Sequence, residues 1–198
     1  MALESGYRKL SELKLEAAIG DFSEALKMDT GQGEAIRRAL ATAEYWWTKT
    51  REQDASLRFG RLLEDFAGYP FDRRTQLFRH NLIVELTGRM LAAGTLVVEE
   101  AVRAFDLLLE CRAYDRAKEL LVALGLEIPG RVEWLYLGAQ VLWRSGERPR
   151  ATHLTARALL SDPGNLAISR IEHPKVKALI AAHGAEKTPA YGWVGKIL

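Results

Sequence analysis

Histidine and cysteine, the residue types that most often hold a metal ion, are few in this sequence and widely spaced. His80, His153, His173 and His183 show no His-x-x-x-His spacing, and Cys111 has no second cysteine with which to form a Cys-x-x-Cys pair. Such spacings place two ligands on the same side of one metal ion. We therefore expect no metal site.

A glycine-rich stretch, TGQGEA at residues 30–35, has the Gly-x-Gly spacing of loops that bind phosphate groups. A dinucleotide-binding loop also needs a preceding strand and a third glycine, and a P-loop needs a lysine. Here a predicted helix precedes the stretch, and neither the third glycine nor the lysine is present. We interpret the stretch as a turn and expect no cofactor.

Acidic residues that could act as a general acid and base occur mainly as adjacent pairs, such as Glu64 with Asp65 and Glu99 with Glu100. Neighbouring residues on a helix point about 100° apart, so such a pair does not converge on one reacting group. No Gly-x-Ser-x-Gly stretch is present either. The sequence predicts no catalytic residues and no enzyme. The alternative is an enzyme whose site is assembled from scattered residues, which would appear as a cleft of titratable groups.

The composition is that of an ordinary folded protein, with 198 residues, 48% of them hydrophobic and 27% charged. A single cysteine excludes an intrachain disulfide framework and is typical of a reducing compartment. The first residues, MALESGYRKL, lack the pattern of a signal peptide, and no apolar run reaches the roughly 18–20 residues that span a bilayer. We expect a cytoplasmic protein that does not enter a membrane.

The C-terminal half of the chain contains a pattern with a period of 34 residues. The residues that repeat at this distance are Leu108 and Leu142, Ala117 and Ala151, Leu120 and Leu154, and Pro129 and Pro163. The second copy also has small residues and a closing proline at spacings of 7, 5, 7 and 5, namely Ala139, Gly146, Ala151, Ala158 and Pro163. A fixed period of this length indicates a repeat of one supersecondary unit.

This spacing resembles the tetratricopeptide repeat (TPR) family, in which each repeat is a pair of antiparallel helices. Small residues let the two backbones approach, a glycine makes the turn, and a proline ends the second helix. Residues 132–165 match closely. Residues 98–131 are a divergent copy, because Phe105, Arg112 and Leu124 replace small residues, although Tyr114 and Asp115 open the second helix as in the family.

A third resemblance covers residues 1–32, where Ala18, Phe22 and Ala25 match the second helix of the repeat and Gly6 matches the first. Leu13 replaces the turn glycine. Residues 33–97 lack the motif, yet helical spacing predicts helices over 34–53, 55–66 and 72–93, with a turn at 68–71 and Asp72 as a cap. Over residues 166–198 we expect a capping helix at 173–184 and a tail.

The resemblance implies one all-α domain over residues 1–198, a right-handed α-α superhelix (a TPR-like solenoid) of about nine or ten helices. It also implies a protein scaffold or adaptor, because the first helices of such repeats line a concave groove that holds a peptide or a partner helix. The candidate groove residues are Val102, Arg103, Asp106, Glu110, Tyr136, Gln140, Trp143 and Arg144. The Lys and Asn set of chaperone-binding members does not occur at the matching positions.

The candidate groove combines residue types that are common at binding hot spots. Tyr136 and Trp143 offer flat apolar contact, and Arg103 and Arg144 can pair with a carboxylate or phosphate. The alternative is that Trp143 packs between helices and the charges are merely solvated. Gln140 and Asp106 complete the set for which we predict partner contact.

A second function class follows from charge, because residues 131–198 carry ten Lys or Arg against five Asp or Glu. A basic helical surface could bind nucleic acid. Its candidate residues are Arg144, Arg148, Arg150, Arg157, Arg170, Lys175 and Lys177. Such binding would weaken steeply with salt. We regard nucleic acid as the alternative to a protein or peptide partner.

Trp46 and Trp47 are adjacent, so they point about 100° apart on the predicted helix. Either a wide buried face accommodates both rings, or one is exposed beside Tyr45. An exposed ring would indicate a partner surface or self-association into a homo-oligomer.

Overall fold

The computed structural model describes residues 2–28, 31–51, 59–94, 97–127 and 132–161. Within these ranges the chain forms nine α-helices and one short 3-10 helix, and no strand occurs there. The expectation of an all-α protein is confirmed. The expected capping helix at 173–184 lies outside the described residues. The chain divides into two compact units, Met1–Ala93 and Gly94–Leu198.

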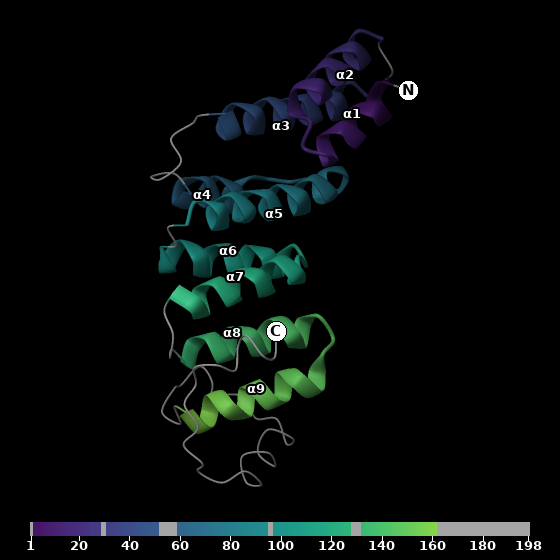
Figure 1. Cartoon of the computed structure of the whole chain (residues 1–198). Coiled ribbons are helices and arrows are strands. Elements are labelled where there is room, and N and C mark those ends of the chain that lie inside the picture. The colour runs from purple at the N-terminus through teal and green to yellow at the C-terminus, as the bar shows by residue number, and fades with distance from the viewer. Residues whose placement is uncertain (1, 29–30, 52–58, 95–96, 128–131, 162–198) are drawn as a thin grey trace. The chain divides into compact units, whose positions relative to one another are not determined.

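The first unit contains five of the α-helices and the 3-10 helix (Figure 1). They are α1 (Ala2–Ser11), α2 (Leu15–Lys27), α3 (Gly33–Arg51), α4 (Phe59–Gly68), η1 (Arg73–Thr75) and α5 (Gln76–Ala92). Helix α2 packs against both α1 and α3, and α4 packs against α5. Helix α1 also contacts α5, where the Asn81 side-chain amide donates a 2.7 Å hydrogen bond to the Ser11 carbonyl. Packing is therefore mostly between consecutive helices, and α3, η1 and α5 also contact α1.

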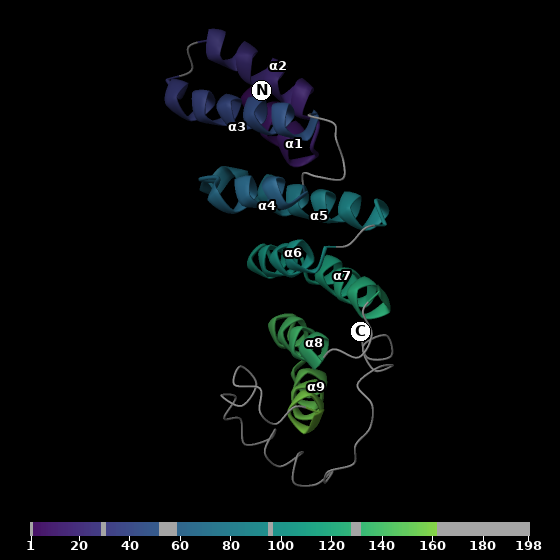
Figure 2. The ribbon, with the colours of Figure 1, turned by 90° about the vertical axis from the view of Figure 1, so that its left-hand side faces the viewer.

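The described residues of the second unit form four α-helices, drawn teal to green in Figures 1 and 2. They are α6 (Val98–Glu110), α7 (Tyr114–Glu127), α8 (Val132–Arg144) and α9 (Arg148–Ser161). Each of them packs against the next along the chain. The core between them is formed by residues such as Ala104, Phe105, Leu108, Leu120 and Leu142, all at most 2% exposed.

Most helix boundaries agree with the sequence pattern. Helix α3 has 19 residues and covers residues 34–51 of the expected segment, and α7 begins at Tyr114 as predicted. The predicted cap is confirmed, because the Asp72 carboxylate accepts hydrogen bonds from the backbone N–H of Arg74 at 2.8 Å and of Thr75 at 2.9 Å. These bonds satisfy donors at the start of η1, which leads into α5.

Three helix hairpins, α1–α2, α6–α7 and α8–α9, are closed by the same turn. One residue in each takes a left-handed conformation, with φ of 60° at Leu13, 58° at Arg112 and 92° at Gly146. The N–H of the residue that follows bonds to a carbonyl five residues earlier, as in a Schellman motif. These bonds join Lys14 to Lys9 (2.9 Å), Ala113 to Leu108 (2.8 Å) and Glu147 to Leu142 (2.9 Å). Leu13 and Arg112 therefore adopt the turn of Gly146 although they carry a Cβ atom.

The conformation of Arg112 predicts a stabilising substitution. Left-handed backbone costs a residue with a Cβ atom about 1–2 kcal/mol, while glycine loses about 0.5–1 kcal/mol more conformational entropy on folding. We expect Arg112→Gly to raise the free energy of unfolding by about 0.5–1 kcal/mol in urea denaturation. Arg112→Ala, which keeps the Cβ atom, is the matched control. An equal gain from alanine would show that the side chain, and not the backbone, carries the cost.

The first hairpin depends on a close approach between α1 and α2. Gly6 is buried, and a Cβ atom there would lie 2.6 Å from Cε1 of Phe22. The Phe22 ring is itself 0% exposed and packs edge-on against Tyr7, with ring centroids 5.2 Å apart. Because the ring is enclosed, it cannot move away without disturbing the core.

Gly6→Ala should therefore destabilise the protein. Overpacking costs about 1–3 kcal/mol, which exceeds the gain of about 1 kcal/mol in helix propensity. Gly20→Ala on α2 is the matched control, because nothing lies within 4 Å of its Cβ position. We expect thermal unfolding to show a lower melting temperature for Gly6→Ala and a raised one for Gly20→Ala. Equal stabilisation of both variants would contradict the close approach.

The adjacent tryptophans have different environments in the first unit. Trp46 is 0% exposed and packs in an aromatic cluster with Phe66, Tyr69 and Phe71. Trp47 is half-buried, and the Arg51 guanidinium lies 4.4 Å from its ring centroid. The helix therefore buries one ring completely and leaves the other partly accessible beneath a cation.

Candidate functional site

Helices α6 and α8 each bury one face and leave another accessible. On α6 the buried residues include Ala101, Ala104, Phe105 and Leu108, and on α8 they include Leu135, Ala139 and Leu142. The residues predicted to contact a partner occupy other positions, three or four residues apart, so those on each helix share one side. Arg103, Asp106, Trp143 and Arg144 are exposed, while Tyr136 and Gln140 are half-buried. We call these six residues the α6–α8 face.

Two carboxylates on α6 and a guanidinium on α8 come within electrostatic range of one another. Asp106 and Glu110 are one turn apart on α6, and both are exposed. Burial raises the pKa of the Asp106 carboxyl above its ordinary value of 3.8, Arg144 opposes this rise, and Glu110 adds to it. Among the described residues, no hydrogen bond or ion pair is made to Asp106. The carboxylate is thus accessible, yet the surrounding protein disfavours its charge.

Trp143 is the large apolar side chain of this face, and it is 45% exposed. It is therefore not enclosed between helices. The guanidinium of Arg148, at the start of α9, lies 5.5 Å from the centroid of the Trp143 ring. A cation over an aromatic ring is attracted to its π electrons, so this contact favours the observed orientation of the ring.

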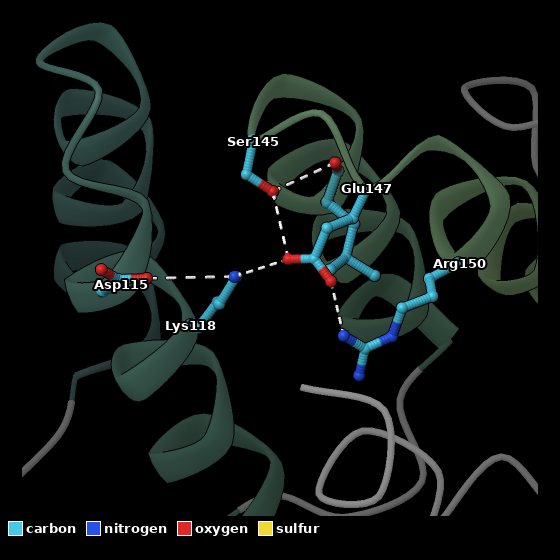
Figure 3. A network of polar contacts seen from close by, with 6 residues as sticks. Asp115, Lys118, Ser145, Glu147 and Arg150 are labelled. Carbon is cyan, nitrogen blue, oxygen red and sulfur yellow. Dashed lines mark hydrogen bonds and ion pairs between the residues drawn. The ribbon is translucent and has the colours of Figure 1, made fainter.

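A polar network positions the end of α8 that carries Trp143 and Arg144 (Figure 3). Lys118 Nζ on α7 donates to Glu147 Oε1 at 2.8 Å, and Arg150 Nη1 donates to Glu147 Oε2. Ser145 Oγ donates to the Leu142 carbonyl at 3.1 Å. Hydrogen bonds from Lys118 and Arg150 lower the pKa of Glu147 below its ordinary value of 4.5. The network ties the α8–α9 turn to the preceding hairpin.

Sequence patterns did not reveal the pairing of Lys118 with Glu147. The two residues are 29 positions apart, and only the packing of α7 against α8 brings them together. The signal that could have found them is the repeat itself, because it predicts that the second helix of one hairpin contacts the next hairpin.

The predicted basic surface lies only partly in the described chain. Arg170, Lys175 and Lys177 are outside the described residues. Of the remaining four, Arg148 lies over the Trp143 ring and Arg150 pairs with Glu147. Two of these cations therefore already contact residues of the same unit.

The described residues show few other features of a functional site. The described residues contain no group of three or more His, Cys, Asp or Glu side chains arranged to hold a metal ion. No helix among them is long and apolar enough to cross a membrane. A shallow open pocket lies in the first unit, between the α1–α2 turn and the end of α3. It is lined by Leu13, Lys14, Leu15, Glu16, Ala17, Trp47 and Thr50.

Comparisons with known proteins return no match for this chain, whether with protein-family models, curated proteins or solved structures.

The environment of Asp106 predicts a pH-dependent gain in stability on substitution. Because the folded state raises its pKa, the cost of ionising Asp106 is absent below about pH 3.8 and appears as the pH rises through the higher folded pKa. Asp106→Asn should therefore raise the melting temperature near neutral pH and leave it unchanged in acid. Asp115→Asn on α7, whose side chain is 100% exposed, is the control. A loss of stability near neutral pH in Asp106→Asn would overturn this account of the charge.

Proposed function

We propose that this chain is a TPR-like repeat protein, a non-enzymatic scaffold or adaptor that binds a peptide or helical segment of a partner protein on the α6–α8 face. The proposal includes a solenoid built from helix hairpins. Its support is that α1–α2, α6–α7 and α8–α9 share one turn geometry and bury an alanine at the same distance after it, at Ala18, Ala117 and Ala151. Equivalent hairpins that pack in succession are the building principle of such solenoids.

The observation that carries the binding proposal is the accessibility of the α6–α8 face. Trp143 exposes 45% of its surface beside Arg144, and Tyr136 and Gln140 are only half-buried on the same helix. Aromatic and arginine side chains supply much of the binding energy at protein interfaces. The packing of α6 and α8 does not explain why these residue types occur on the face, because residues on the opposite side of each helix fill the core.

Affinity capture from a lysate of the native cells tests this proposal. The immobilised wild-type chain is compared with a Tyr136→Ala, Arg144→Glu double variant, and retained proteins are identified by mass spectrometry. We expect a protein retained by the wild type to be lost from the variant, because both changes remove contacts of the α6–α8 face. The matched control is Tyr114→Ala, Arg116→Glu on α7, which carries the same changes on the second helix of a hairpin.

Circular dichroism first establishes that all forms remain helical. If the wild type and both variants retain the same proteins, the α6–α8 face is not the binding surface. If all forms retain mainly nucleic acid that salt removes, the basic surface is the functional one instead.

A further inference from the structure

Resting on the proposed function, we propose that the end of the α6–α8 face that carries Trp143 binds an acidic partner segment, in which an aspartate or glutamate lies next to a large apolar side chain. The carboxylate of the partner pairs with the guanidinium of Arg148, and the neighbouring apolar side chain packs on the Trp143 ring. The proposed function leaves the charge of the partner open, and this inference assigns it.

One contact brings a cation and an exposed aromatic ring together. Arg148 Cζ lies over the Trp143 ring, 5.5 Å from its centroid, and Trp143 is 45% exposed. Arg148 is exposed as well. A guanidinium carries its N–H donors in its own plane, so a ring against its face leaves the donors at its edge accessible to a planar carboxylate. The two residues therefore offer an apolar surface and a bidentate donor within reach of one peptide segment.

The acid that directly precedes Arg148 has other partners. Glu147 accepts hydrogen bonds from Lys118 Nζ at 2.8 Å and from Arg150 Nη1, one on each carboxylate oxygen (Figure 3). Among the described residues Arg148 forms no ion pair or hydrogen bond, and its guanidinium contacts the Trp143 ring. A partner carboxylate would therefore gain these donors without displacing an acid of the chain.

The charged side chains at this end of the second unit, taken together, leave a positive excess. Outside α7, the basic residues here are Arg103, Arg112, Arg144, Arg148 and Arg150, and the acidic ones are Asp106, Glu110 and Glu147. Helix α7 does not change the balance, because its first two turns carry Asp115 and Glu119 against Arg116 and Lys118. Glu110 and Arg103 have contacts of their own, and Arg144 attracts Asp106. An acidic segment is therefore attracted to this end, and a basic segment is repelled.

A nucleic acid would also bring negative charge to these arginines and flat bases to Trp143. Its phosphates follow one another along the strand and are best matched by a continuous basic track. Asp106 and Glu110 interrupt such a track on α6, and Glu147 interrupts it in the α8–α9 turn. A single carboxylate beside an apolar side chain needs only Arg148 and Trp143. The distribution of charge therefore favours an acidic peptide.

Short capped peptides that form a matched series provide the test. The first alternates glutamate with leucine and phenylalanine, the second has lysine at every glutamate, and the third has serine at every apolar position. A labelled oligothymidylate is the nucleic-acid probe. Fluorescence anisotropy with the full chain, at low salt and near neutral pH, measures the affinities. We expect the glutamate peptide to bind about tenfold tighter than each of the other probes, because only it satisfies both contacts.

Variants then assign the two contacts. Arg148→Gln should weaken the glutamate peptide by about tenfold, and Arg148→Lys should restore only part of that loss, because it keeps the charge without the planar donors. Trp143→Ala should abolish the advantage over the serine peptide. Arg116→Gln on α7, which removes one positive charge from the same unit, is the control and should change neither. An independent readout is the NMR resonance of the Arg148 Nε–Hε group, which should shift when the glutamate peptide binds.

The outcomes separate this inference from the proposed function. Equal or tighter binding of the lysine peptide, or an Arg148→Gln variant that binds like the wild type, overturns the selection of an acid. If Trp143→Ala still loses binding in that case, the α6–α8 face remains a binding surface. Tighter binding of the oligothymidylate assigns the arginines to nucleic acid and also overturns the inference. So does a glutamate peptide that fails to bind at millimolar concentration, and the capture experiment then decides separately whether the face binds any protein.

Discussion

The tight turn between paired helices is the constraint on which the rest of this structure depends. It reverses the chain within three residues, so two helices must lie antiparallel with their apolar sides together. At Gly146 the left-handed conformation carries no steric cost, whereas at Leu13 and Arg112 it does. The packing of the hairpins compensates that cost, because Ala18, Ala117 and Ala151, five residues after the turn residue, are buried.

The antiparallel pairing also determines which side chains are left for a partner. Once α6 and α8 turn their small and aliphatic residues inward, Asp106, Trp143 and Arg144 must lie away from the core. The ionic contact of Lys118 with Glu147 then links consecutive hairpins and fixes the end of α8. The candidate binding surface is therefore a consequence of hairpin packing.

Asp106 is a carboxylate whose ionisation carries a cost in the folded protein. The chain compensates Asp21, Asp65 and Glu147 with lysines, but leaves Asp106 in an environment that disfavours its charge. Trp143 likewise leaves part of an apolar ring exposed to water.

The sequence by itself determined the features that depend on neighbours within one or two helical turns. The extent of α3, the start of α7 at Tyr114, the turn at Gly146 and the cap at Asp72 all follow from local spacing and hydrogen bonding. The accessibility of the six predicted partner residues also agrees with helical periodicity, since residues three or four apart share a side.

Only the tertiary structure decided the features that join distant parts of the chain. It placed Leu13 and Arg112 in the turn conformation of glycine, buried Trp46 rather than Trp47, and paired Lys118 with Glu147. It also created the environment of Asp106, which depends on Arg144 and Glu110 together with the burial around it. These outcomes could not be predicted locally, because steric strain, burial and charge compensation are settled by the packing of whole helices.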